Sequence, residues 1–318
     1  MKQVVFLLLF CTVQVWSQGS VILDAQTQEP VSFATISFGD GRGTFAGEDG
    51  RFSFTKKTYP DIDSLFISSI GYQEKGVAIN NLPPKILLLP ETNLLSEVVV
   101  SAPKRGKYKT KKLKPDTHQD IIACWLPTVE SEVAVLFERI EGKSSKIAIL
   151  QLPIYAEANY RSKGKGNVPT VFRIQFYENE DGKPGLPFPH EKIVFLIDSQ
   201  EDKVFELDIL SKRIFIPENG LFASIQVLGY ADKDGKLAQS KKYREIKTRA
   251  GVKKISTAFR PLLPFSNQRS NQKTFVRRVF LNKRKWQIFD ERYNENSMLI
   301  QGNYRNYAMG ATLHVYQE

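Results

Sequence analysis

The sequence predicts an all-β protein made of two β-sandwich domains. Short apolar runs alternate with turn signals along most of its 318 residues. Several runs alternate apolar and polar residues, which is the period of a half-buried strand, and no segment sustains the 3.6-residue period of a helix. With 42% hydrophobic and 25% charged residues, the composition is globular and excludes a disordered, collagen-like or disulfide-stapled chain.

Residues 1–17 have the pattern of a secretory signal peptide. A basic start at Lys2 precedes the apolar run Val4–Phe10, and Val15 and Ser17 lie at the −3 and −1 positions of a cleavage site. The apolar run is far shorter than the roughly 20 residues of a membrane-spanning helix, and no later segment is long and apolar enough. We therefore expect an exported chain that is periplasmic, associated with the outer membrane or secreted, without a transmembrane segment.

Cleavage would remove Cys11 and leave Cys124 as the single thiol, so no internal disulfide is expected. Cys124 lies in the apolar run 121–126, which favours a small buried hydrophobic side chain. The alternative is a catalytic thiol assisted by His118, but no local signature supports it.

Residues 18–101 are expected to form the first sandwich. Asp49-Gly50 lies between two apolar runs, which is the strongest short hairpin signal. The expected strands are Val21–Leu23, Phe33–Phe38, Arg51–Thr55, Leu65–Ile70, Val77–Ile79, Ile86–Leu89 and Val98–Val100.

This stretch resembles the carboxypeptidase-like regulatory domain through several spaced motifs. They are Val21–Asp24, Thr27, Pro30-Val31, Ala34, Gly43-Thr44, Asp49–Phe52, Ser69–Tyr72 and Leu95–Val100. The resemblance implies a transthyretin-like, seven-stranded sandwich of the kind found at the front of TonB-dependent receptors. One departure from the family pattern is Gly19-Ser20, which stands in place of the usual opening glycine. The other is that only about 200 residues follow the domain, too few for a receptor barrel, so the resemblance implies a stand-alone exported relative. None of the motif positions is chemically equipped for catalysis.

The sequence does not support the zinc site that the family name suggests. Neither a His-x-x-Glu pair nor a complete His-Glu-x-x-His motif is present, because Val194 stands where the second histidine would follow His190-Glu191. We expect His190 at a strand edge, and we expect no metal, cofactor or catalytic site.

Residues 102–117 are expected to be a basic linker, since 103–115 holds seven cations and no acid. Residues 18–100 carry a net charge of −4 and residues 101–318 carry +14. The basic segment either attaches to anionic lipid, lipopolysaccharide or acidic polysaccharide, or is a solvated connection that keeps two domains apart. An exported chain makes nucleic acid a poor partner.

Residues 118–318 are expected to form a second, jelly-roll-like sandwich. The acidic group 178–182 suggests a hairpin turn, with a Ca²⁺ site as the alternative. The expected strands are Val133–Phe137, Lys146–Leu152, Thr170–Tyr177, Lys192–Ile197, Val204–Ile209, Leu221–Gly229, Phe275–Leu281, Met298–Gln301 and Ala311–Tyr316.

The late part of this domain is basic and aromatic, which suits stacking on sugar faces and pairing with anions. Alternation would place Phe275 with Arg277 on one face, an unusual pattern that suggests an edge or interface strand. The candidate binding residues are Arg277, Arg278, Arg284, Lys285, Trp286, Tyr304 and Tyr307. The same residues would otherwise be core aromatics with solvated cations around them.

The sequence thus predicts a non-catalytic exported envelope protein that binds an anionic glycan, lipopolysaccharide or lipid, or an outer-membrane protein. One alternative is a hydrolase acting on glycans or peptides, with a site in the second domain assembled from distant residues. Another is a structural envelope protein recognised through its β edges.

Overall fold

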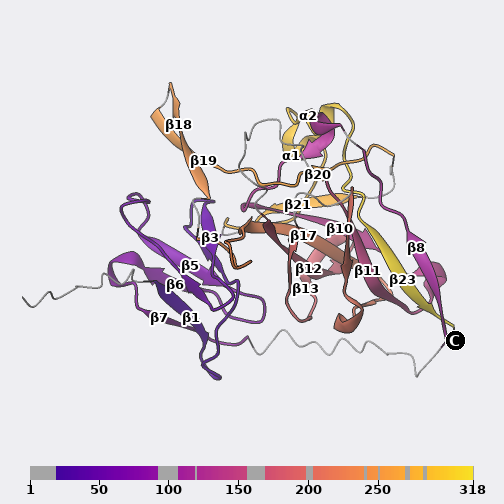
Figure 1. Ribbon diagram of the computed structural model, residues 1–318, viewed down its shortest axis with the longest axis horizontal. Coiled ribbons are helices and arrows are strands. Elements are labelled where there is room, and N and C mark those ends of the chain that lie inside the picture. Colours follow the sequence, from indigo (N-terminus) through magenta and orange to yellow (C-terminus); the bar gives the residue numbers. More distant parts are fainter. Residues whose placement is uncertain are drawn as a thin grey trace, which may run out of the picture.

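The computed structural model describes residues 19–91, 107–118, 120–155, 169–197, 203–239, 242–249, 251–268, 273–281 and 285–317. Nearly every regular element in these ranges is a strand, which confirms the predicted all-β class. The strands before residue 91 gather on one side of the molecule and most of those after residue 107 lie on the other, while the hairpin of residues 243–256 rises above the first side (Figure 1). The predicted signal peptide and the strand expected at Val98–Val100 lie outside the described residues.

The first domain is a sandwich of a three-stranded and a four-stranded sheet. The first sheet has the order β4-β1-β7, in which β1 and β7 run parallel, and the second has the order β3-β2-β5-β6. The strands are β1 (Ser20–Asp24), β2 (Thr35–Ser37), β3 (Gly43–Phe45), β4 (Arg51–Phe52), β5 (Ser64–Ser68), β6 (Lys75–Ala78) and β7 (Lys85–Leu88).

Alternating apolar side chains of both sheets fill the space between them. Ile22 in β1, Ile36 in β2 and Leu65 in β5 are fully buried, as the period of two requires. The Asp49-Gly50 turn forms, with a φ of +71° at Gly50 and a hydrogen bond from the Arg51 amide to the Asp49 carboxylate at 3.0 Å. It does not close the predicted hairpin, because β3 and β4 on either side of it lie in different sheets. The turn therefore positions β4 beside β1.

The second domain packs a seven-stranded sheet against a five-stranded sheet. The larger sheet has the order β13-β12-β17-β10-β21-β22 with β14 also on β12, and the smaller has the order β15-β11-β23-β8 with β16 also on β11. The larger sheet consists of β10 (Ser131–Phe137), β12 (Thr170–Glu180), β13 (Lys183–Pro187), β14 (Ile193–Ile197), β17 (Leu221–Tyr230), β21 (Thr274–Arg278) and β22 (Gln287–Ile288). The smaller consists of β8 (Tyr108–Leu113), β11 (Ser145–Pro153), β15 (Val204–Asp208), β16 (Phe215–Ile216) and β23 (Gly310–Tyr316).

The main core lies between these two sheets, and a smaller apolar cluster covers the other face of the larger sheet. Nine of the ten residues of β17 are buried, because β17 is central and covered on both faces. The smaller cluster joins Ala134, Tyr177, Phe222 and Phe275, with Trp286 at its margin. The outer face of the larger sheet is therefore not a plain solvent face.

One predicted strand is a helix. Residues Met298–Gln301 form α2, which buries Leu299 and Ile300 and leaves Met298 exposed. A four-residue apolar run has no period from which helix and strand can be distinguished. The remaining short elements are α1 (Glu291–Asn294), β9 (Cys124–Trp125), β20 (Leu263–Pro264) and the 3₁₀ turns η1 (Ile79–Asn81), η3 (Ile121–Ala123), η4 (Ile140–Gly142) and η5 (Leu210–Lys212).

The segment expected to be a linker contains a strand. β8 (Tyr108–Leu113) pairs antiparallel with β23 at the edge of the smaller sheet. Lysines are common on edge strands because they discourage pairing with other chains, while the backbone still forms the sheet ladder on its inner side. This part of the basic segment therefore belongs to the second domain.

The two domains pack against each other. Phe45 of β3 belongs to the main core of the second domain and meets Phe280 with 5.3 Å between ring centroids. The Ser37 hydroxyl donates to the Phe280 carbonyl at 2.6 Å. The Tyr243 hydroxyl accepts a hydrogen bond from the Gly43 amide at 2.7 Å and donates to the Gly43 carbonyl at 3.2 Å. The first domain is thus fixed on the second rather than held apart from it.

A buried lysine lies near this interface, immediately before β18 (Tyr243–Thr248). Lys242 is 4% exposed, and its ammonium donates to the Ala238 carbonyl at 3.2 Å. Burial lowers the pKa of Lys242 to about 8. Replacing this charge with a side chain of similar length should stabilise the fold, because keeping a charge in an apolar site is unfavourable.

We therefore expect Lys242→Met to raise the free energy of unfolding at pH 7 by about 1–3 kcal/mol in urea denaturation. Between pH 8 and the ordinary lysine value of 10.5 the unfolded chain holds more protons than the folded one, so the native protein should gain stability as pH rises there. The Met variant should lose that gain. A Met variant less stable than the parent at pH 7 would contradict this account.

Candidate functional site

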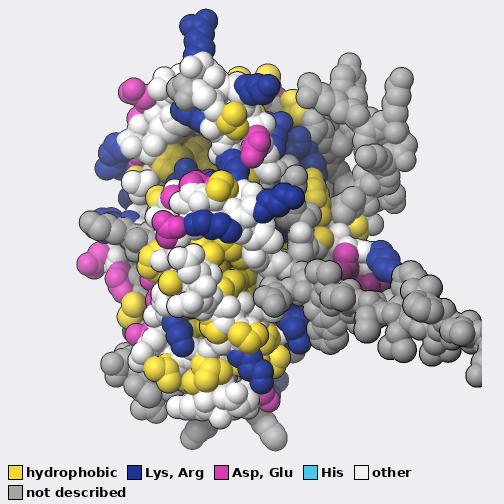
Figure 2. Space-filling view, turned by 90° about the vertical axis from the view of Figure 1, so that its left-hand side faces the viewer, with side chains coloured by type: hydrophobic (Ala, Val, Ile, Leu, Met, Phe, Trp, Pro, Cys, Tyr) yellow, Lys and Arg dark blue, Asp and Glu magenta, His cyan; other side chains and the backbone are white. Residues whose placement is uncertain are grey.

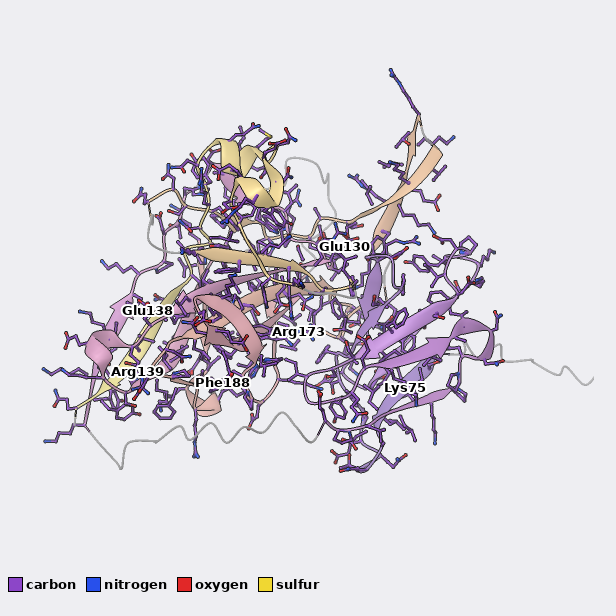
Figure 3. The ribbon with its side chains drawn as sticks, turned by 180° about the vertical axis from the view of Figure 1, so that it is seen from behind. Lys75, Glu130, Glu138, Arg139, Arg173 and Phe188 are labelled. Carbon is purple, nitrogen blue, oxygen red and sulfur yellow. The ribbon has the colours of Figure 1, made fainter. Side chains whose placement is uncertain are left out.

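A cleft of about 430 Å³ lies between the two domains. We call it the interdomain cleft. Its floor in the second domain is formed by Arg173 and Gln175 of β12 and Arg277 of β21. Figure 3 shows Arg173 on the side of the larger sheet that faces the first domain. The wall in the first domain includes Thr35, Ser68, Ser69, Tyr72, Glu74 and Glu91.

Register across four strands explains how distant residues meet at the floor. Arg173 pairs with Gln226 of β17, Gln226 pairs with Glu132 of β10, and Glu132 pairs with Arg277 of β21. Directly paired residues of a sheet point to the same face. The four polar side chains therefore form one row on the outer face of the larger sheet.

Glu132 is the centre of a buried hydrogen-bond network. It is fully buried, and Arg277 pairs with it at 2.7 Å. The hydroxyls of Ser224 and Tyr177 lie 2.5 Å and 2.9 Å from the same carboxylate. Burial alone would lower the pKa of Arg277, but the charge of Glu132 outweighs it and the pKa is raised. The pair is thus held charged inside the sheet.

Arg277 is also enclosed by aromatic rings. Its guanidinium carbon lies 4.9 Å from the Tyr177 ring centroid and 4.6 Å from that of Trp286. The two rings meet edge to face at 5.2 Å. Cation–π contacts of this kind are stronger where water is excluded. Arg277 and Trp286, both predicted to bind a ligand, are therefore together but largely occupied by protein partners.

Arg173 is less fully partnered. One guanidinium nitrogen donates to the Phe33 carbonyl of the first domain at 3.2 Å, another donates to the Gln226 side-chain oxygen, and the group lies 5.4 Å from the Phe45 ring centroid. Its Nε and the Nε2 of Gln226 are buried donors without a hydrogen-bond partner. Burial lowers the pKa of Arg173, and the nearby Arg277 adds to this against the opposing charge of Glu132. An unpaired buried donor is costly, so this corner favours an acceptor group.

The charge at the floor is positive. Arg173 and Arg277 lie in the same row as a single buried carboxylate, Glu132. Lys192 is exposed and donates to the Ser32 carbonyl at 2.8 Å, and partial desolvation of its ammonium together with the charge of Arg173 lowers the pKa of Lys192 to about 8. The cleft wall contributes two further carboxylates, Glu74 and Glu91. The cleft suits a ligand with an anionic group at the floor and hydroxyl or amino groups at the wall.

The structure does not bring all the predicted binding residues together. Arg278 forms an ion pair with Glu130, and Lys285 is exposed. Tyr304 lies elsewhere, with its ring 5.8 Å from that of His118. Arg284 lies outside the described residues.

Tyr307 is not a surface residue. It is fully buried, and its hydroxyl donates to the Pro153 carbonyl at 3.0 Å. Its expected role in binding is corrected to a core position, because no part of the ring reaches the surface. The periodic pattern could not reveal this, since 302–309 is a loop between α2 and β23.

Glu132, Arg173 and Gln226 were not among the predicted site residues. The signal was present as charged or amide residues inside strongly apolar strands, as in Phe172-Arg173-Ile174. Such residues were interpreted as the solvent face of an amphipathic strand. In the structure the first domain packs over these residues and so encloses the cleft. The alternation of residues along one strand cannot predict which other domain packs on it.

The proposed thiol–imidazole pair finds no support in the geometry. One ring nitrogen of His118 contacts the Phe265 carbonyl at 2.8 Å, and the other accepts a hydrogen bond from the Asp120 amide at 3.2 Å. The Cys124 thiol is buried and donates to the Asp120 carbonyl at 3.3 Å. Both ring nitrogens of His118 are therefore engaged by backbone groups.

The two segments considered for a metal ion, His190-Glu191 and residues 178–182, also have local structural roles. His190 lies beside β12, where its Nε2 accepts from the Phe176 amide at 3.2 Å. Residues 178–180 end β12, and residues 181–182 form the turn of the β12–β13 hairpin, with Gly182 at a φ of +80°. Among the described residues, no group of three or more His, Cys, Asp or Glu side chains is arranged to hold a metal ion.

Comparison with known protein families identifies the first domain. A family model described as the CarboxypepD_reg-like domain matches residues 18–100. Residues 18–100 are a CarboxypepD_reg-like domain. The match confirms the predicted resemblance over that stretch and agrees with the two-sheet sandwich seen there.

The CarboxypepD_reg-like domain supplies one wall of the interdomain cleft, and the second domain supplies the floor. Searches of curated proteins and of solved structures each find no significant match. No helix within the described ranges is long and apolar enough to cross a membrane.

Proposed function

We propose that the protein is a non-catalytic, exported binding protein of the cell envelope that holds an acidic carbohydrate in the interdomain cleft. The observation that carries this proposal is the cationic floor, where Arg173 and Arg277 both line the cleft beside a single buried carboxylate, Glu132. A carboxylate or phosphate oxygen in the cleft would pair with these guanidinium groups and balance the excess positive charge.

The shape and the wall of the cleft support a sugar rather than a simple ion. Its volume of about 430 Å³ lies within the usual range of small-ligand sites. The Tyr72 hydroxyl donates to Asp24 at 2.8 Å, and Tyr72, like an ordinary tyrosine, is uncharged at neutral pH and adds no negative charge to the wall. The hydroxyl groups of a sugar would meet Glu74 and Glu91 as acceptors.

Export rests on the signal-peptide pattern of residues 1–17, and the CarboxypepD_reg-like domain supports a binding or regulatory role. In this proposal that domain is a docking module that completes the site. The fixed contacts between the domains support a site of constant shape, which lowers the entropic cost of binding.

The test is calorimetric titration of residues 18–318 with trigalacturonic acid, with neutral maltotriose and with lipopolysaccharide, at low and high salt. We expect the acidic sugar to bind at least about tenfold more tightly than the neutral one, since a hydrogen bond to a charged group contributes about 1.5–3 kcal/mol. Binding should weaken with salt. Equal affinity for the acidic and neutral sugars would overturn the proposal.

A blocking variant links the binding to this cleft. Ser69 lines the cleft and is half-buried, so Ser69→Trp should fill the space without removing any buried ion pair. We expect it to abolish binding of the acidic sugar and to leave the thermal unfolding midpoint within a few degrees of the parent. Asn80→Trp, at an exposed position in η1, is the matched control. If Ser69→Trp binds as tightly as Asn80→Trp, the site lies elsewhere.

A further inference from the structure

Two features that the interdomain cleft does not use lie on one side of the molecule. One is the hairpin arm, formed by β18 (Tyr243–Thr248) and β19 (Gly251–Ser256). The other is the apolar depression, a hollow of about 470 Å³ beside η3 and α2. In Figures 1 and 3 the hairpin arm and the helices both stand on the upper side of the molecule, the arm over the first domain and the helices over the second.

The hairpin arm is basic and projects from the body of the protein. Its exposed cations near the tip are Lys247, Arg249 and Lys253, and Arg244 is exposed nearer the base. Glu245 is the acidic residue of the two strands. Figure 2 shows a basic side chain as the most protruding feature on this side. Like charges at the end of a projecting ribbon create a positive potential where it first meets another surface.

The base of the arm is held firmly. Tyr243 makes two hydrogen bonds to the Gly43 backbone, and Lys254 donates to the Thr58 carbonyl and lies 4.6 Å from the Tyr59 ring centroid. An isolated two-stranded hairpin is marginally stable in water. These contacts with the first domain therefore present the cationic tip in a fixed direction.

The apolar depression carries unusually exposed side chains. Ile122 is 60% exposed, Leu126 53% and Met298 64%, and Ile121 at 43% lies beside them. Val252, near the tip of the hairpin arm, is 62% exposed. Of the six large apolar side chains more than half exposed among the described residues, four are on this side. Clustered exposure of this kind marks an interaction surface.

We propose that this side of the protein binds the surface of a membrane that contains anionic lipids. Cations that meet lipid phosphates and apolar side chains that enter the interface are the two components of peripheral membrane binding. A glycan would use the cations but not the isoleucine, leucine and methionine side chains, and a protein strand that paired with the hairpin edge would not use the apolar depression. The proposal does not depend on the sugar-binding function of the interdomain cleft.

The test is co-sedimentation of residues 18–318 with vesicles of phosphatidylglycerol and phosphatidylcholine in equal parts, and with vesicles of phosphatidylcholine alone. We expect binding to the anionic vesicles that weakens at high salt, and much weaker binding to the neutral ones. Equal binding to both vesicles, or binding to neither, would overturn the proposal.

Charge variants locate the contact. Replacing Lys247, Arg249 and Lys253 with glutamine should lower the partition coefficient for anionic vesicles by roughly a hundredfold, because each cation near the surface contributes a factor of roughly five. The matched control replaces Lys107, Lys109 and Lys183, which are also exposed. These lie before or on β8 and at the start of β13, away from the upper side (Figure 1). Equal losses in the two triple variants would show attraction by net charge alone and overturn the assignment.

An apolar variant tests the second component. Ile122→Ser with Met298→Ser should weaken binding to anionic vesicles by roughly tenfold or more while leaving its salt dependence unchanged. Both side chains are exposed, so the fold should be retained in thermal unfolding. Unchanged vesicle binding in this variant would remove the apolar depression from the contact and refute the two-component surface.

Discussion

Glu132→Gln should destabilise the protein by about 3–5 kcal/mol, because it leaves the enclosed guanidinium of Arg277 without its counter-charge. Glu132 is fully buried and receives Arg277, Ser224 and Tyr177 as hydrogen-bond partners. A neutral amide has a single acceptor oxygen and introduces two donors, so the network cannot be satisfied. Urea denaturation followed by tryptophan fluorescence would measure the loss.

A double variant separates the charge from the packing. Replacing Glu132 and Arg277 together with methionine should restore part of the stability lost in Glu132→Gln, since no unpaired charge remains. Glu245→Gln, at an exposed position of the hairpin arm, is the control and should change stability by less than about 0.5 kcal/mol. A loss below about 1 kcal/mol for Glu132→Gln would show that the network does not stabilise the sheet.

The strands that carry this network show which features the sequence could predict and which it could not. The alternation in Thr170–Tyr177 correctly predicted most of β12. Phe275 and Arg277 on one face predicted an edge or interface strand: β21 is not an edge, but its Arg277 lines the interdomain cleft. β21 is paired on both sides, by β10 and β22, and its outer face is covered by Trp286 and Tyr177. Which strands lie next to which is set by long-range packing, so the row from Arg173 to Arg277 could not be derived from spacing.

The first domain was the most predictable part, because its turn chemistry and strand spacing are local. The Asp49-Gly50 turn and the alternation around Ile22 are properties of a few neighbouring residues. The family match covers this same stretch. The second domain has no such local signature, and its class was predicted correctly only because strand periodicity is general.

Two elements were missed for a common physical reason. β8 and the hairpin arm are rich in lysine and arginine; the segment with β8 was predicted to be a linker, and no strand was predicted for the hairpin arm. Backbone hydrogen bonds need no apolar side chain, so an edge strand or a projecting ribbon forms with charged residues along it. Exposed strands that are rich in charged residues therefore lack the apolar pattern by which strands are predicted.

The interface between the domains gives the second large effect. Phe280→Ala should destabilise the protein by about 3–5 kcal/mol, as expected for deleting a buried aromatic side chain. Phe280 is fully buried, its ring contacts Phe45, and a β-carbon added at Gly43 would lie 2.4 Å from it. Gly43 has no side chain, so the two domains can approach this closely. The stability lost in Phe280→Ala should therefore come from the contact between the domains.

The same variant should change how the protein unfolds. Phe45 is part of the main core of the second domain, so the parent should unfold in a single calorimetric transition in which both domains take part. Phe280→Ala should separate this into two transitions, with the first domain released from the second. Phe222→Ala removes an equally buried ring from the smaller cluster on the outer face, so it should cost a similar amount and keep one transition. A single transition in Phe280→Ala, or a split in Phe222→Ala, would show that Phe280 does not couple the domains.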